Sequence, residues 1–189
     1  MRVCLFGGSF DPVHQGHLNI AREAQKRCGL DLIIFLPCAC SPLKKVSPLA
    51  SDNQRIDMLS LAIESFSWAR LDLTDMQLPP PSWSWRVAEH IRHEYPKAEL
   101  FWLMGTDQWI DLERWDQWTH LSEMLTFIVH FRQGCAPLPR EGVKSIFIEG
   151  DHPASSSAIR QMLHDGEMIP KGWLAPSIVE YIQKNRIYS

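Results

Sequence analysis

"RVCLFGGSFDPVHQGHLNIAREAQKRCG", residues 2–29, decides the fold of this chain. The mostly apolar residues 2–6 predict a buried strand, and the two glycines that follow are expected to end it. Residues 17–29 predict a helix that stops at Gly29 and carries one apolar stripe of Leu18, Ala21, Ala24 and Cys28. The stretch therefore predicts a strand, a turn and a helix, the opening part of a β-α-β unit.

The same alternation continues along the rest of the chain. Further strands are predicted over residues 31–37, 69–73, 99–104, 125–131 and 145–150. Helices are predicted over residues 51–66, through Val87, Ala88 and Ile91, and over residues 155–166 and 176–186. Ser51 and Gln54 have the spacing of a capping box. Apolar strands alternating with amphipathic helices are typical of a parallel sheet covered on both faces. We expect one α/β domain over residues 1–189, built on a Rossmann-like, doubly wound, mainly parallel sheet.

Ligands of such sheets bind beyond the carboxyl ends of the strands. The predicted topology brings four segments to that edge: residues 7–17, 37–45, 105–115 and 150–160.

Composition narrows the classes of function. The chain has 189 residues, 45% hydrophobic and 22% charged, with a formal net charge of −3. No strongly basic face is implied, which disfavours a nucleic-acid partner. No apolar run approaches the ~20 residues that span a bilayer, and the first residues enter a strand rather than a signal peptide. The five cysteines are odd in number, with one C-x-C and no further pair at zinc spacing. We expect reduced thiols, no protein-held metal, no membrane partner and a cytoplasmic location.

The segment after the first strand carries the chemistry. Gly7 and Gly8 allow a ligand to approach the backbone closely, and Gly16 leaves room between two histidines. His14 and His17 lie at the expected helix start, where free N–H groups attract phosphate. Two imidazoles with helix-end amides are suited to stabilising charge on phosphate oxygens during phosphoryl or nucleotidyl transfer.

Two other interpretations compete with nucleotide binding. The segment matches neither the P-loop nor the dinucleotide fingerprint. A plain strand–turn–helix with incidental histidines would explain Gly8 but not two histidines at this edge. A metal site would need a third ligand, and none stands at an obvious spacing. Nucleotide binding is therefore favoured.

Two later segments fit the same interpretation. "SSSAIR", residues 155–160, offers hydroxyls and free amides at a helix start, followed by the forked cation Arg160; taken alone it would be ordinary capping. In "MGTDQWIDLERW", residues 104–115, Gly105 allows close approach, Asp107 can accept from ribose hydroxyls and Trp115 offers a flat face to a ring. Trp109 and Trp118 are expected in the core.

These motifs resemble those of the nucleotidylyltransferase superfamily. "GGSFDPVHQGH" is similar to its [T/H]-x-G-H signature, and "SSSAIR" to the S-S-T-x-I-R signature of the bacterial-type nicotinate-nucleotide adenylyltransferase family, with Ser157 in place of threonine. The likeness covers almost the whole chain. It implies a nucleotidylyltransferase-type fold and transfer of AMP from ATP to nicotinate mononucleotide, with Mg²⁺. The products would be deamido-NAD, an intermediate of NAD biosynthesis, and pyrophosphate.

The resemblance also assigns roles to residues. The implied catalytic residues are His14, His17 and Arg160. The implied ATP-binding residues are Gly7, Gly8, Ser9, Phe10, Gly16, Gly105, Asp107, Ser156, Ser157 and Ile159. The implied mononucleotide-binding residues are Lys44, Trp83, Ser84, Trp115 and Arg132. Arg55 falls at another arginine of the family, for which we expect a structural role.

Besides Ser157, three positions depart from the family pattern. Trp83 and Ser84 stand where the family has P-S-Y-T, and Leu43 replaces the histidine of P-H-K. The acceptors nicotinamide mononucleotide and phosphopantetheine therefore stay open as alternatives, as do an inactive nucleotide-binding module and assembly into a homo-oligomer.

Overall fold

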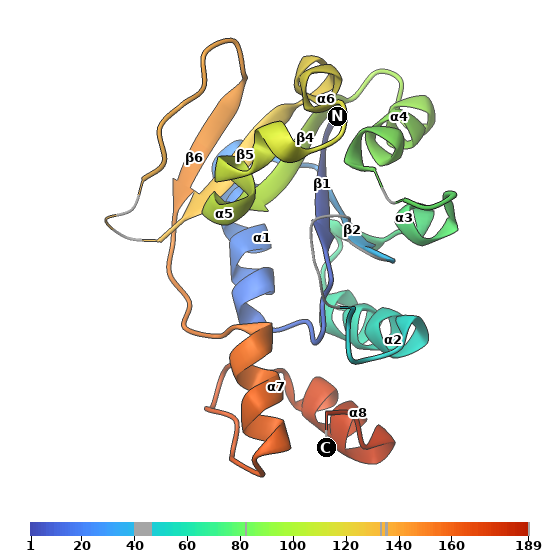
Figure 1. Ribbon diagram of the computed structural model, residues 1–189, viewed down its shortest axis with the longest axis vertical. Helices are drawn as coiled ribbons and strands as arrows, with labels where there is room; N and C mark the ends of the chain where they lie inside the picture. Colours follow the sequence, from blue (N-terminus) through green and yellow to red (C-terminus); the bar gives the residue numbers. More distant parts are fainter. Residues whose placement is uncertain (40–46, 82, 133, 135, 189) are drawn as a thin grey trace.

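One parallel sheet organises the molecule (Figure 1). The computed structural model describes residues 1–39, 47–81, 83–132, 134 and 136–188. Six strands lie in the order β3-β2-β1-β4-β5-β6, and every neighbouring pair is parallel. The strands are β1 (Arg2–Gly8), β2 (Leu32–Pro37), β3 (Ala69–Leu71), β4 (Glu99–Gly105), β5 (Thr126–Phe131) and β6 (Ser145–Glu149). This order, which reverses direction at β1, confirms the doubly wound Rossmann-like sheet.

Helices cover both faces of the sheet. One apolar core joins the sheet to α1 (Gln15–Cys28), α2 (Asp52–Ile63), α7 (Ser156–His164) and α8 (Pro176–Asn185). The other joins it to α4 (Ser84–Glu94), α5 (Thr106–Ile110), the 3-10 turn η1 (Leu112–Arg114) and α6 (Trp118–Met124). The short helix α3 (Thr74–Gln77) precedes α4. Within the described ranges, no helix has the length and apolar character needed to cross a membrane.

The carboxyl ends of the strands face α7 and α8. Figure 1 shows both helices beyond that end of the sheet, below the start of α1. Residues 9–17, called the histidine segment from here on, follow β1 at this end. The histidine segment therefore lies between the sheet and helices α7 and α8.

The glycines after residue 6 do not end the first strand, contrary to expectation. β1 continues through Gly7 and Gly8, which pair with Leu36 and Pro37 of β2. Aromatic rings crowd the positions of the missing Cβ atoms: a Cβ on Gly7 would lie 3.3 Å from the Trp102 ring. One on Gly8 would lie 3.0 Å from the ring of Phe10. The protein's own aromatic rings therefore occupy much of the space beside these two glycines.

Other element boundaries also differ from the sequence prediction. Helix α1 begins at Gln15, two residues early, and β3 stops at Leu71. The capping box at the start of α2 is confirmed, since Ser51 and Gln54 exchange backbone-to-side-chain hydrogen bonds of 2.9 and 3.3 Å. The short elements α3, α5, η1 and α6 escape the sequence prediction, because they are too short to show a helical period.

Candidate active site

His14 and His17 form a stacked pair at the start of α1. His14 is the N-cap residue and His17 is the third helical residue. The backbone N–H of His14 donates to Nδ1 of His17 at 3.3 Å, and the ring centroids lie 3.8 Å apart at an interplanar angle of 30°. The ring of Phe10 packs edge-on against His17 at 5.1 Å. Since Nδ1 of His17 accepts, the neutral ring carries its proton on Nε2, as a hydrogen-bond donor.

His14 is buried in a space that requires a glycine. Its side chain is among the buried polar groups, at 8% exposure. A Cβ on Gly16 would lie 2.8 Å from the His14 ring and 3.3 Å from the carbonyl oxygen of Ala154. Nδ1 of His14 is buried and has no hydrogen-bond partner among the described residues. A buried nitrogen of this kind is costly unless a ligand completes its bonding.

Burial sets the protonation state of His14. Loss of hydration, with a smaller contribution from the nearby charge of His152, lowers the pKa of His14 from 6.5 to about 4. His14 is therefore neutral at physiological pH in the ligand-free protein. A bound phosphate would favour the protonated ring and raise this pKa.

This shift predicts an acid-dependent loss of stability. The folded pKa lies below the unfolded value, so between pH 6.5 and 4 the unfolded chain binds more protons at this group. The free energy of unfolding should therefore fall as the pH drops through that window, by up to about 3 kcal/mol. Urea unfolding at several pH values measures it, and His14→Asn should show a correspondingly shallower dependence. Equal pH dependence in both proteins would contradict the assignment.

Side chains from α7 hold the backbone of the histidine segment. Nη1 of Arg160 donates to the carbonyl oxygen of Asp11 at 2.7 Å and lies 3.6 Å from its carboxylate. The Ser156 hydroxyl donates to the carbonyl oxygen of Pro12 at 3.0 Å. Nη2 of Arg160 lies 3.4 Å from the Ser157 hydroxyl. The predicted phosphate-binding residues of α7 are thus brought next to the histidines.

Arg55 holds the other end of the same segment. Its fully buried guanidinium donates to the carbonyl oxygen of Ser9 at 2.7 Å and to Asp52 at 2.7 Å. The structure supports the structural role expected for this residue.

The remaining residues predicted for ATP differ in what they can offer. The side chains of Phe10 and Ile159 are buried in the core at 1% and 0% exposure, so only their main chains can reach a ligand. Asp107 is exposed in the first turn of α5. A Cβ on Gly105 would lie 2.7 Å from Asp107 Oδ1, so this glycine lets the carboxylate fold back over the strand end.

Of the residues predicted for the mononucleotide, Trp115 packs against the core on the face of the sheet that is covered by α4. It packs edge-on against Trp102 at 5.8 Å, and Trp102 is the ring that contacts the position of Gly7. Trp83 is the N-cap of α4 and Ser84 its first residue. Arg132 is exposed directly after β5. Lys44 lies outside the described residues.

The tryptophans assigned to the core behave as expected. Trp109 is 2% exposed within the core formed with α5, and Trp118 packs against that core.

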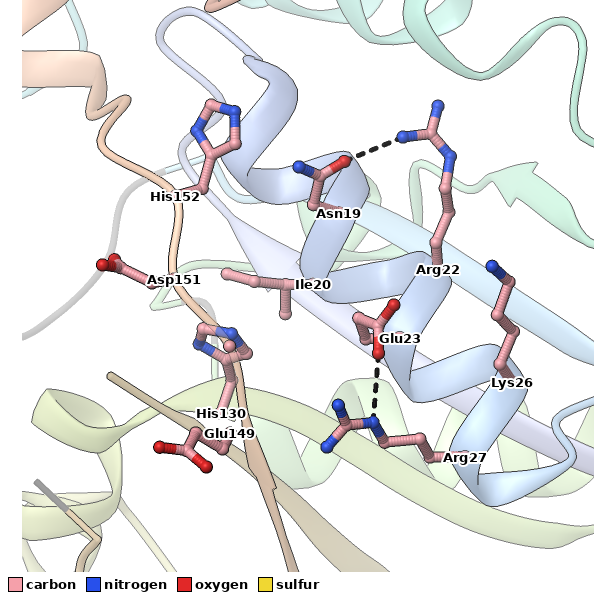
Figure 2. Close-up of a pocket in the computed structure, with 11 residues that line it drawn as sticks. Asn19, Ile20, Arg22, Glu23, Lys26, Arg27, His130, Glu149, Asp151 and His152 are labelled. Atoms are coloured by element: carbon pink, nitrogen blue, oxygen red, sulfur yellow. Dashed lines mark hydrogen bonds and ion pairs between the residues drawn. The ribbon is translucent and has the colours of Figure 1, made fainter. Parts of the chain in front are cut away.

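A cleft of about 510 Å³ runs along α1, between this helix and the segment after β6 (Figure 2). Figure 2 shows one wall formed by side chains of α1, including Asn19 and Glu23, and the opposite wall by His130 and the segment after β6. His152 lines this cleft and is the residue whose charge acts on His14. Nδ1 of His152 accepts from the backbone N–H of Ala154 at 3.1 Å, which fixes its ring. His14 and His17 are not among the residues that line this cleft, so it approaches the histidine pair only through His152.

Sequence reasoning missed Asp11 and Tyr188. The Asp11 carboxylate is 4% exposed and accepts a hydrogen bond of 2.8 Å from the Tyr188 hydroxyl. The sequence did offer one signal for Asp11: a carboxylate between Phe10 and Pro12, in a segment expected to be buried, needs hydrogen-bond partners. Nothing in the sequence around Tyr188 indicated a partner so far away in the chain.

Comparison with known proteins identifies the family. The family model described as cytidylyltransferase-like matches residues 5–162. A probable nicotinate-nucleotide adenylyltransferase of Methylacidiphilum infernorum is 37% identical, over 99% of this chain and 92% of its own length. A probable nicotinate-nucleotide adenylyltransferase of Thermus thermophilus is 34% identical over 100% of both chains.

A solved structure shows the same fold. The Plasmodium falciparum nicotinic acid mononucleotide adenylyltransferase complexed with NaAD superimposes with a TM-score of 0.79 at 21% identity, covering 99% of this chain and 97% of its own. Together with the stacked histidines and the adjoining arginine, the comparisons confirm the family expected from the motifs. The chain belongs to the cytidylyltransferase-like family and, within it, to the nicotinate-nucleotide adenylyltransferases.

Proposed function

We propose that this protein transfers AMP from ATP to nicotinate mononucleotide, forming deamido-NAD and pyrophosphate. The observation that carries the proposal is the stacked pair of His14 and His17 at the start of α1, with Arg160 of α7 on the same segment. The family to which the chain belongs supplies the acceptor.

For this reaction the protein must position the two substrates and stabilise the negative charge on their phosphates. A 5′-phosphate oxygen of the mononucleotide attacks the α-phosphorus of ATP, and the bond from that phosphorus to the bridging oxygen of the β-phosphate breaks. The attacking phosphate is already ionised near neutral pH, so it needs no general base. Nε2–H of His17 donates to a phosphate oxygen, where charge grows in the transition state. Arg160, from α7, adds a fixed positive charge to the phosphates.

Mg²⁺ enters as part of the ATP substrate. When bound, it neutralises charge on the phosphate oxygens. Among the described residues, no group of three or more His, Cys, Asp or Glu side chains is arranged to hold a metal ion. The nearest polar groups are imidazoles, whereas Mg²⁺ prefers oxygen ligands, so we assign its ligands to the triphosphate and water.

The remaining predicted residues take roles consistent with their positions. The exposed Asp107 is assigned to the ribose of ATP, and Ser156 and Ser157 to its phosphates. Trp115, Trp83, Ser84 and Arg132 are assigned to the mononucleotide, which would then lie on the side of the sheet covered by α4. Cys4 and Cys28 are free thiols, which suits the cytoplasmic location we propose.

The acceptor is tested by direct comparison. Pyrophosphate release is measured with ATP and nicotinate mononucleotide, nicotinamide mononucleotide or phosphopantetheine. We expect kcat/KM to be highest for nicotinate mononucleotide, by roughly 10- to 100-fold over the amide, because a charged acceptor group forms stronger hydrogen bonds than a neutral one. A preference for the amide or for phosphopantetheine would overturn the acceptor. ATP binding without pyrophosphate release for any acceptor would indicate a nucleotide-binding module.

A further inference from the structure

The residues after α8 are packed into the molecule next to the histidine segment. The backbone turns back there through Arg186 and Tyr188, both with positive φ, of 50° and 70°. Ile187 and Tyr188 are buried, at 7% and 9% exposure. Left-handed backbone at residues other than glycine costs about 1 kcal/mol each. Tertiary contacts of this segment must therefore hold its conformation.

Tyr188 completes the bonding of a buried carboxylate. Oδ1 of Asp11 accepts from the Tyr188 hydroxyl at 2.8 Å and from the backbone N–H of Ala50 at 3.0 Å. Oδ2 accepts from the backbone N–H of Leu49 at 2.9 Å and lies 3.6 Å from Nη1 of Arg160. A buried carboxylate is tolerated only when it is paired and hydrogen-bonded in this way. Asp11 thus joins parts of the chain that are far apart in sequence.

The Tyr188 hydroxyl is a permanent donor in this network. Burial, followed by the hydrogen bond to Asp11, raises the pKa of Tyr188 above its ordinary value. The hydroxyl therefore keeps its proton throughout the range in which the enzyme works.

Asp11 is also connected to the predicted catalytic groups. It lies three residues before His14 in the sequence, and its carbonyl oxygen receives Arg160. The backbone N–H of Gln15, beside His14, donates to the carbonyl oxygen of Trp173 at 2.9 Å. Residues from α7 onward thus hold the chain that leads into α1. The Asp11 carboxylate links this part of the molecule to Leu49 and Ala50 as well.

We propose that Asp11 and Tyr188 are positioning residues for nucleotidyl transfer, which hold the histidine segment and Arg160 in register without touching the substrate. The inference rests on the proposed function, because it assigns the phosphates to those groups. Removing the Tyr188 hydroxyl leaves one carboxylate oxygen with a single donor. Asp11 can then shift toward Arg160, and the positions of Arg160 and His14 relative to each other are no longer fixed. Misplacement of this size lowers the rate of the chemical step more than it lowers ground-state binding.

The test compares two tyrosines that make the same kind of bond. Tyr181 on α8 donates to Asp57 of α2 at 2.6 Å in an exposed hydrogen bond, which does not involve the Asp11 network. Tyr188→Phe and Tyr181→Phe each remove one tyrosine–aspartate hydrogen bond. We expect Tyr188→Phe to lower kcat about tenfold, with KM for ATP within threefold of the wild type. Tyr181→Phe should keep kcat within twofold. Equal kcat in the two variants would overturn the proposal.

Asp11→Asn gives a second arm through a double-mutant cycle. The asparagine side chain keeps the shape of aspartate, but its NH₂ group cannot accept the hydrogen bonds that one carboxylate oxygen accepts. The kcat should therefore fall further than in Tyr188→Phe. Adding Tyr188→Phe to Asp11→Asn should then produce little additional loss, because the two residues act through one bond. Fully multiplicative effects would show that they act independently and would count against the proposal.

A readout that does not use activity separates this inference from the proposed function. Amide hydrogen exchange of residues 9–17 should be faster in Tyr188→Phe than in Tyr181→Phe, with thermal midpoints compared in parallel. Equal exchange in this segment would overturn the positioning role whatever reaction the enzyme catalyses. Absence of pyrophosphate release from the wild type with every acceptor would overturn the proposed function alone.

Discussion

His17→Ala should lower kcat by about 10²- to 10³-fold, because it removes a donor aimed at charge that develops in the transition state. The imidazole of His17 is oriented by the backbone N–H of His14, which donates to its Nδ1, and by the edge of Phe10. This places the proton on Nε2. The assay is pyrophosphate release with ATP and nicotinate mononucleotide at saturating concentrations of both.

Two substitutions separate the nitrogens of His17. Glutamine places an amide N–H near the position of Nε2, whereas asparagine mimics only the accepting Nδ1. His17→Gln should therefore retain more activity than His17→Asn. His164→Ala, at the exposed end of α7, serves as the control and should keep normal turnover. Near-normal turnover in His17→Ala would overturn the role of this residue in transfer.

Arg160→Ala should lower kcat by about 10²-fold and also destabilise the fold. The guanidinium donates to the Asp11 carbonyl oxygen at 2.7 Å, and the proposed function also assigns it the positive charge that faces the phosphates. The loss leaves the buried carboxylate of Asp11 without its nearby cation. We expect the free energy of unfolding to fall by roughly 1–3 kcal/mol.

Arg160→Lys distinguishes the two roles of the guanidinium. Lysine keeps the charge but lacks the fork that reaches both the Asp11 carbonyl and Ser157. Stability should recover more completely than kcat, as urea unfolding and steady-state kinetics will show. Equal recovery of both would mean that charge alone matters and that the fork does not position substrate.

The sheet could be predicted because its signal is local. Continuous apolar runs such as residues 99–104 and 125–131 have few alternatives to a buried strand, and the amphipathic stripe of α1 needs only its own residues to be recognised. The histidines could be placed at the sheet edge for the same reason, because strand ends and helix starts converge there in every doubly wound sheet.

The errors arose where tertiary contacts determine the local conformation. Gly7 and Gly8 read as a break, yet the strand continues by pairing with β2, and the rings of Trp102 and Phe10 leave little room there for a Cβ atom. The early start of α1 depends on His17 accepting from the His14 backbone, which propensity does not reveal. The contact of Asp11 with Tyr188 spans 177 residues, and no single-sequence pattern reports such a distance.

The placement of Tyr188 has a consequence for the order in which the enzyme is made. The histidine motif is translated early, but the groups that shape it, Ser156, Arg160 and Tyr188, are translated more than a hundred residues later. A nascent chain halted before residue 156 would carry the complete signature without an arranged site. By the positioning role proposed for Tyr188, full activity would be reached only after this residue has left the ribosome, and a translation product that stops short of it would turn over ATP more slowly.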